Sequence, residues 1–293
     1  LVAEYGAFIS FALVWGAASD ALGRRAPLVV VGAVGGAASY LLLASLPALG
    51  VGFGGVLVVR VLGGAFTIGA FSLGITMLMD LAGGNGRNMG AAGIAIGLGA
   101  ALGSIAGGQL AALSPFGPVY AGAAVLGGAG LVAATVDETA TETSSEADAA
   151  APDRRGVGAA VDTLRSTPAL GVPFAFGFVD RLTAGFFSLV GVFYFGDVFG
   201  LDAAGVGIAL ALFFLPFALL QYPLGSLSDR IGRFVPVVAG SVGYGVTIIA
   251  VGLAQTVEVA MGLMALVGVA GAFVAPATMA LVTDLVDPAE RGV

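Results

Sequence analysis

The stretch Gly16-Ala-Ala-Ser19-Asp20-Ala-Leu-Gly23-Arg24-Arg25 lies where a hydrophobic run ends, and a close copy of it occurs 209 residues later. The copy reads Gly225-Ser-Leu-Ser228-Asp229-Arg230-Ile-Gly232-Arg233 and also follows a hydrophobic run. Both copies keep the order Gly, two residues, Ser-Asp, two residues, Gly-Arg, on what we expect to be a tight turn. Repeated chemistry at so long a period indicates a duplicated architecture.

A second repeat supports the duplication. Met77-Leu-Met-Asp80-Leu, followed by Arg87, is matched 204 residues later by Leu281-Val-Thr-Asp284-Leu, followed by Arg291. The two repeats occur in the same order in each half of the chain. We therefore expect the second half to reuse the helix arrangement of the first.

The composition places the chain in a membrane. Hydrophobic residues make up 58% of the 293 residues and charged residues only 10%, whereas an ordinary soluble domain has about 25% charged residues. The 49 glycines suit close helix packing in lipid, where small residues let backbones approach. These proportions predict an all-α integral membrane protein.

Missing residue types exclude several functions. The chain has no cysteine and no histidine, which excludes disulfide frameworks, thiolate nucleophiles and serine–histidine triads. It also has no lysine, so the phosphate-binding loop of ATP-driven pumps cannot be built. We expect no enzyme activity, no cofactor, no metal and no nucleic-acid partner. The acidic pI of about 4.4 fits codon bias in a GC-rich genome and a halophile-like composition equally well.

Nine apolar stretches are long enough to cross about 30 Å of hydrocarbon. They lie near 3–19, 26–47, 51–79, 89–112, 117–135, 168–196, 204–224, 234–254 and 257–283. Between the fifth and sixth, residues 136–166 are acidic, then basic, and rich in Ser, Thr and Ala, which predicts a solvated linker. The predicted domains are a first bundle at 1–135, the linker at 136–166 and a second bundle at 167–293.

The arginines predict the orientation. Nine of the eleven fall in alternate connections, and the loops between those connections have none. By the positive-inside rule the arginine-bearing loops and the linker are cytoplasmic, in a multi-pass protein of the cytoplasmic membrane. The nine are Arg24, Arg25, Arg87, Arg154, Arg155, Arg165, Arg230, Arg233 and Arg291, whereas Arg60 and Arg181 lie inside spans.

The repeated loop resembles the signature of the major facilitator superfamily, where it joins helices 2 and 3 and recurs between helices 8 and 9. The resemblance implies two bundles of six helices, of which this chain would carry helices 2–10, without helices 1, 11 and 12. It also implies that the loops latch the bundles in one state through Asp–Arg pairing. An alternative is that the arginines only set orientation. The implied gating residues are Gly16, Asp20, Gly23, Arg24, Arg25, Gly225, Asp229, Arg230, Gly232 and Arg233.

Three charged sites inside or near spans are candidates for coupling. Arg60 starts an Arg-three-residues-Gly pattern that resembles a helix-4 motif associated with proton coupling, and Glu4 is its expected partner. A charge at such a depth costs about 2.5–3.5 kcal/mol on insertion scales. Asp180 and Arg181 lie midway along the span 168–196, and Asp180 is the expected carboxylate that alternates between a proton and a cationic substrate. Purely structural ion pairs are the alternative at both sites.

Glycines in the span 89–112 are similar to the helix-5 signature of drug–proton antiporters, with serine in place of its proline. The matching positions are Gly90, Gly99, Gly103, Ser104, Gly107 and Gly108. We therefore expect a monomeric secondary transporter that works by alternating access, with a small organic molecule as substrate, protons as coupling ions and efflux as the direction. The alternatives are a metabolite or sugar symporter or uniporter of the same fold, and a non-transporting membrane sensor or scaffold.

Overall fold

The protein is entirely helical wherever its structure is defined. The computed structural model describes residues 2–79, 85–136 and 187–285, together with 165, 168–171, 175, 178 and 185. In this part of the chain every regular element is a helix, so the all-α prediction is confirmed. The chain divides into two compact units, Leu1–Met89 with Leu113–Ala150, and Gly90–Ala112 with Ala151–Val293.

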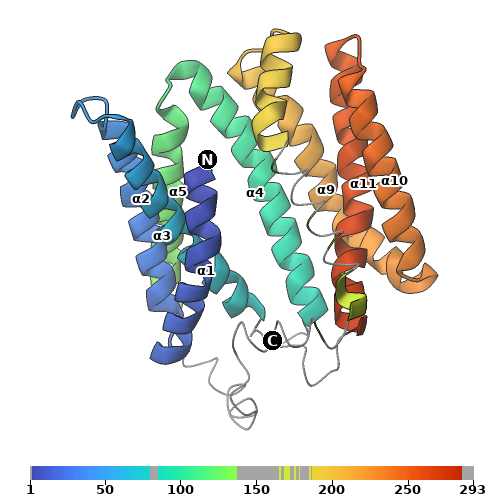
Figure 1. Cartoon of the computed structure of the whole chain (residues 1–293), viewed down its shortest axis with the longest axis horizontal. Coiled ribbons are helices and arrows are strands. Elements are labelled where there is room, and N and C mark those ends of the chain that lie inside the picture. Colours follow the sequence, from blue (N-terminus) through green and yellow to red (C-terminus); the bar gives the residue numbers. More distant parts are fainter. Residues whose placement is uncertain are drawn as a thin grey trace. The chain divides into compact units, whose positions relative to one another are not determined.

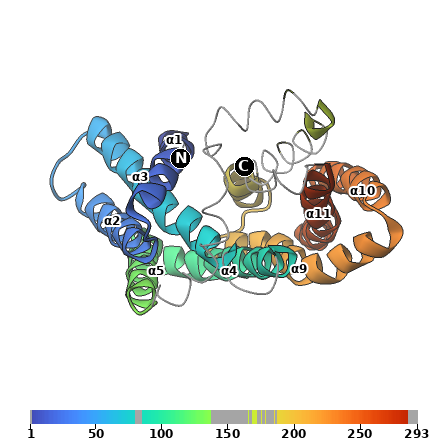
Figure 2. The same ribbon diagram turned by 90° about the horizontal axis from the view of Figure 1, so that it is seen from below.

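The first unit is built around α3. Helix α1 (Val2–Leu22) and α2 (Ala26–Ser45) both pack on α3 (Phe53–Met79), and α5 (Gly117–Ala134) packs on the other side of α2. Figures 1 and 2 show these four helices running alongside one another. The helix α4 (Asn85–Leu113) links the units along the chain, and its residues 90–112 belong to the second unit.

In the second unit α11 takes the place that α3 has in the first. Helices α9 (Ala203–Ile231) and α10 (Phe234–Gly252) both pack on α11 (Val257–Leu285). Three short helical segments precede them, namely η2 (Pro168–Leu170) and the π-helical η3 (Phe187–Gly191) and η4 (Tyr194–Val198). The Tyr194 hydroxyl donates a 2.6 Å hydrogen bond to the Val251 carbonyl, which joins η4 to the end of α10.

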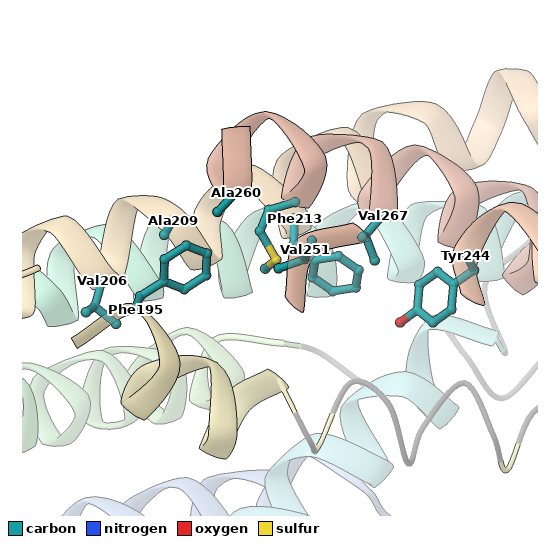
Figure 3. Close-up of a cluster of buried hydrophobic side chains, with 9 residues drawn as sticks. Phe195, Val206, Ala209, Phe213, Tyr244, Val251, Ala260 and Val267 are labelled. Atoms are coloured by element: carbon teal, nitrogen blue, oxygen red, sulfur yellow. The ribbon is translucent and has the colours of Figure 1, made fainter. Parts of the chain in front are cut away.

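An apolar core fills the second unit between these elements. Its fully or almost fully buried side chains come from η4, α9, α10 and α11, and Figure 3 shows them converging. They are Phe195, Val206, Ala209, Phe213, Tyr244, Val251, Ala260, Met264 and Val267. One cluster thus holds these four consecutive elements together.

Eight of the nine predicted spans correspond to helices that are long and apolar enough to cross a membrane. The remaining one, 168–196, lies partly outside the described residues, and its described parts include η2, η3 and most of η4. The predicted linker at 136–166 also lies outside them, except for Val136 and Arg165. The proposed domain limits stay a prediction.

The repeated stretches are more helical than their glycines suggest. Helix α1 continues to Leu22 and α9 to Ile231, so each Ser-Asp pair lies in the last turn of its helix. The tight turns begin at Gly23 and Gly232. Gly23 (φ +63°) and Gly232 (φ +88°) have positive φ values where the two helices end. The preceding serines turn inward: Ser19 is 4% exposed and Ser228 is completely buried. The two copies therefore share a local structure as well as a sequence.

Close backbone contacts hold α1 against α3 and α9 against α11. A β-carbon added at Gly64 of α3 would collide with the Glu4 carbonyl oxygen of α1. A β-carbon at Gly268 of α11 would collide with the Phe213 carbonyl oxygen of α9 in the same way. Small residues at such crossings let helices approach closely enough for dispersion forces to hold them in lipid.

The two halves differ along the helices that end in the repeated loops. Helix α9 contains Pro216 and Pro223 in its interior. The corresponding positions of α1, 209 residues earlier, are Ala7 and Val14. Each internal proline removes one backbone hydrogen bond from α9, whereas α1 keeps its full set of donors.

We predict that Gly232→Ala lowers the thermal stability of the protein in detergent. At φ 88° and ψ 160° the backbone of Gly232 lies in a region essentially restricted to glycine, and an alanine held there costs about 1–3 kcal/mol. The matched control is Gly245→Ala on α10, where the added methyl group meets nothing within 4 Å and favours the helix. Equal melting temperatures for the two variants would contradict this account of the helix end.

Candidate functional site

The first candidate site follows from the close crossing of α1 and α3. Arg60 lies one turn before Gly64 on α3, and Gly64 meets the backbone of Glu4. This proximity lets the Arg60 guanidinium reach the Glu4 carboxylate, with 2.7 Å between Nη1 and Oε2. The two side chains are 32% and 16% exposed. The structure therefore brings together the two residues that the sequence suggested as partners.

A small cavity surrounds this ion pair and adds residues that the sequence analysis did not single out. It is bounded by three helices of the first unit, α1, α2 and α3. The lining residues are Glu4, Ser39, Tyr40, Leu43, Val59, Arg60 and Gly63. Tyr40 brings a phenol to the two charged groups, so the site combines a carboxylate, a guanidinium and a hydroxyl.

The charges of this site are isolated within the unit. In the spans of α1, α2 and α3, at 2–19, 26–45 and 53–78, Glu4 and Arg60 are the only charged residues of the sequence. Arg60 lies seven residues after the start of α3, which is about 10 Å along the axis. Ionisable groups at such depth usually pair with one another and mark ion or substrate pathways.

The second repeated loop contains an ion pair. The Arg233 guanidinium pairs with the Asp229 carboxylate one turn before it and also donates a 3.4 Å hydrogen bond to the Ser228 hydroxyl. Gly225, which begins this stretch, lies against Pro276 of α11, where an added β-carbon would be 3.4 Å from the proline Cβ. Arg230 is exposed. This loop is thus braced by a charge pair and by contact with a neighbouring helix.

The first loop is one residue longer than the second, with Gly23, Arg24 and Arg25 between its two helices. The Gly23 amide donates a 3.0 Å hydrogen bond to the Ser19 carbonyl, and Arg25 is the N-cap residue of α2. Gly16 is helical, with open space around its α-carbon. The side chain of Asp20 lies outside the description, and Arg24 is exposed at the turn. Asp180 and Arg181, the predicted pair on the span 168–196, also lie outside the described residues.

Helix α4 packs on α9 through glycines, but not through most of those that the sequence singled out. A β-carbon at Gly108 would lie 2.5 Å from the Ala203 carbonyl oxygen, and one at Gly207 would collide with the Ser104 carbonyl oxygen. Gly99, Gly103 and Gly107 have nothing within 4 Å. The Ser104 hydroxyl donates a 2.8 Å hydrogen bond to the Ala100 carbonyl, so it stays within α4. The environment of Gly90 is not described.

Two other glycines complete the α4–α9 contact. A β-carbon at Gly97 would lie 2.5 Å from the Ala218 Cβ, and one at Gly93 would collide with the Gln221 amide oxygen. Gly93, Gly97, Ser104 and Gly108 are spaced so that they share one face of a helix. The signal that could have found them is this four- and seven-residue spacing of small residues.

The described residues contain no group of three or more His, Cys, Asp or Glu side chains that could hold a metal ion. What the structure offers is two helical units with matching loops, and one charged pair within a bundle of spans. These are features of a polytopic membrane protein of duplicated design.

Comparison with known proteins agrees with this class. The family model described as "Major Facilitator Superfamily" matches residues 1–196 and 174–293. The chain therefore belongs to the major facilitator superfamily and is a multi-pass membrane protein. Its sequence is similar to the tetracycline resistance protein, class G, of Vibrio anguillarum, at 30% identity over 250 residues. That alignment covers 78% of this chain and 59% of the relative, so the chain spans less than two thirds of the relative's length.

We predict that Gly97→Val destabilises the second unit. The added side chain must displace Ala218 of α9, and overpacking of this kind costs about 1–3 kcal/mol. The matched control is Gly99→Val, two residues away on the same helix, where the side chain enters open space. Thermal unfolding in detergent should lower the midpoint of the first variant only. A fall of the same size in both would assign the effect to helix propensity.

Proposed function

We propose that the protein is a secondary active transporter that exports a small organic molecule by alternating access, in exchange for protons. The observation that carries alternating access is the shared local structure of the two repeated loops. Each has a buried serine, an aspartate in the last helical turn, a glycine of positive φ and an arginine at the start of the next helix. A latch on both halves suits two bundles that rock against each other around one substrate site.

The chemistry of the second loop supports such a latch. Asp229 is 63% exposed at its side chain even though it pairs with Arg233, which leaves carboxylate lone pairs for another donor. A carboxylate at this place can accept hydrogen bonds from arginine or from the amides that begin a neighbouring helix. Arginines are sufficient to set the orientation of the protein in the membrane, because acidic residues contribute little to the positive-inside rule. An aspartate in the loop is therefore not needed for orientation.

The direction and the substrate class rest on similarity. The relative is named a tetracycline resistance protein, and the glycines of α4 resemble a drug–proton antiporter signature. Both favour efflux of a small organic compound, and tetracycline is the natural first probe. A metabolite or sugar symporter or uniporter of the same fold is the alternative. A sensor or scaffold without transport would not need matching loops in both halves.

Several finer assignments belong to the same proposal. Arg60 with Glu4, and Asp180 with Arg181, are the coupling sites. The arginine-bearing loops and the linker face the cytoplasm, in the cytoplasmic membrane, and the protein acts as a monomer. The positive-inside distribution of arginines supports the sidedness.

We predict that Asp229→Ala abolishes proton-driven tetracycline transport into inverted vesicles while leaving membrane insertion intact, because the latch loses its carboxylate. The matched control is Asp197→Ala, which removes an exposed aspartate from η4. Transport by the control should stay near the wild-type rate. Unchanged transport by Asp229→Ala, at equal abundance in the membrane, would contradict the gating role.

A further inference from the structure

The chain has one tryptophan, Trp15, which directly precedes the first repeated stretch. Its indole N–H donates a 2.6 Å hydrogen bond from Nε1 to the Ala65 carbonyl oxygen of α3. One turn further along α3, a β-carbon added at Gly69 would collide with the indole ring. An indole N–H away from water needs an acceptor, and the bare backbone under the ring lets it reach one. The end of α1 is therefore joined to α3 by a hydrogen bond and by close packing.

The same segment of α3 also holds α2, the helix that follows the first loop. A β-carbon at Gly35 of α2 would collide with the Phe66 ring, and one at Gly32 would lie 2.8 Å from the Phe66 carbonyl oxygen. The rings of Phe66 and Trp15 are 6.4 Å apart and tilted by 57°. Trp15, Phe66 and Gly69 thus form an aromatic clamp that fixes both helices of the first loop on α3.

The indole of the aromatic clamp also reaches the buried core of the first unit. Trp15 packs against a cluster formed by Val29 of α2, Leu73 of α3 and Ala133 of α5. It lies about two turns before Leu22, where α1 ends. A side chain in contact with three neighbouring helices holds the last two turns of α1, and these turns contain the start of the repeated stretch.

The second unit allows a comparison because its contacts lie at fixed intervals from those of the first. Gly268, 204 residues after Gly64, meets the carbonyl of Phe213, which is 209 residues after its counterpart Glu4. These intervals are the spacings of the two sequence repeats. Helix α9 therefore matches α1 at an interval of 209 residues, and α11 matches α3 at an interval of 204.

The aromatic clamp is not repeated at the matching positions. The second unit has Leu224, Ala270 and Phe273 at these three places. The leucine, which replaces the tryptophan, has no side-chain donor for a carbonyl of α11, and the alanine has no ring to stack. The hydrogen bond between the first and third helices of the first unit therefore has no counterpart at this place in the second.

The second loop is instead braced by exposed groups. Asp229, which is 63% exposed at its side chain, pairs with Arg233, and Gly225 lies against Pro276. Water and other charged groups compete for an exposed ion pair, so such a pair holds its partners weakly. A hydrogen bond between two helices inside a span has no bulk water to compete with it. The two loops thus share a sequence pattern but differ in how firmly their helices are held.

We propose that Trp15 is a positioning residue that holds the first repeated loop in one place on α3, while the second loop makes and releases its contacts. This assignment rests on the proposed function, in which the two loops form the latch. Trp15 acts through the last two turns of α1, which carry Ser19 and Asp20, and does not itself contact the substrate. Without the indole donor these turns separate from α3 more often, and the aspartate of the latch loses its fixed position.

A direct test measures the opening of each loop without transport. The chain has no cysteine, so one introduced thiol reports on one place. Ser19→Cys and Ser228→Cys place a thiol at the buried serines of the two loops, which are 4% and 0% exposed. A maleimide reacts only after local opening, so the labelling rate follows the population of the opened state.

In the full chain in lipid vesicles, Trp15→Phe should raise the labelling rate of Ser19→Cys roughly tenfold, because one interhelical hydrogen bond is lost. The matched reporter Ser228→Cys should keep its labelling rate, because the second loop does not depend on the indole. An unchanged rate at Ser19→Cys would overturn the proposal. An equal rise at both thiols would also overturn it, because it would show general loosening of the protein.

Fluorescence of the single tryptophan gives a second measurement. Gly69→Ala pushes the indole away from α3, so it should increase quenching of Trp15 by acrylamide and speed the labelling of Ser19→Cys. The matched control is Gly74→Ala on the same helix, where the added methyl group meets nothing within 4 Å. If Trp15→Phe failed to fold, wild-type quenching and labelling in Gly69→Ala would still overturn the proposal.

Transport tests the consequence for the latch. At equal abundance in the membrane, Trp15→Phe should lower the maximal rate of proton-driven tetracycline uptake by inverted vesicles roughly tenfold. Its KM should stay unchanged, because the indole acts on the loop and not on the substrate. The matched control Phe11→Leu, which alters an aromatic side chain of α1 that is 39% exposed, should keep the wild-type rate. A wild-type maximal rate in Trp15→Phe would contradict the positioning role.

These measurements also distinguish this proposal from the proposed function. If the wild-type protein transported no tetracycline, the proposed substrate class would fail, while labelling and quenching would still report on Trp15. If the wild-type protein transported tetracycline and Trp15→Phe changed neither the labelling of Ser19→Cys nor the maximal rate, only the positioning role would fail.

Discussion

The architecture depends on two places where one helix backbone lies directly on another without a side chain between them. Gly64 on Glu4 and Gly268 on Phe213 set the distance of the α1–α3 and α9–α11 crossings. In lipid, water does not drive apolar helices together, so such contacts and the dispersion forces they allow provide much of the attraction. The ion pair of Arg60 follows from the first crossing and the apolar core from the second.

Much of the fold could be predicted from the sequence because membrane-spanning length and arginine placement are strong signals. Eight spans and the duplicated loops were found in this way. The Glu4–Arg60 pairing was predictable as well, because two lone charges in neighbouring spans have few alternatives to each other. The extension of α1 to Leu22 and of α9 to Ile231 is not predictable from the sequence, because glycine-containing segments at the ends of apolar runs are typical of turns.

The face of each helix that meets a neighbouring helix could not be predicted from the sequence in the same way. Spans that are apolar on every side give no periodic signal for the face that meets a neighbour. The presence of Tyr40 beside the ion pair and the contact of Gly93 and Gly97 with α9 therefore emerged only from the structure. Gly99, Gly103 and Gly107 matched a motif by spacing but face open space. Spacing alone does not define helix rotation.

The internal prolines of α9 give the two halves different mechanical properties. Pro216 and Pro223 each leave one carbonyl of the preceding turn without its helical donor, and helices bend most easily where the ladder of hydrogen bonds is interrupted. Helix α1, with Ala7 and Val14 at the matching positions, is the stiffer rod. The Glu4–Arg60 pair thus belongs to the unit with the stiffer helix, whereas the helix that bends more easily belongs to the other unit. The positions of ionisable side chains vary least where the helices that hold them bend least.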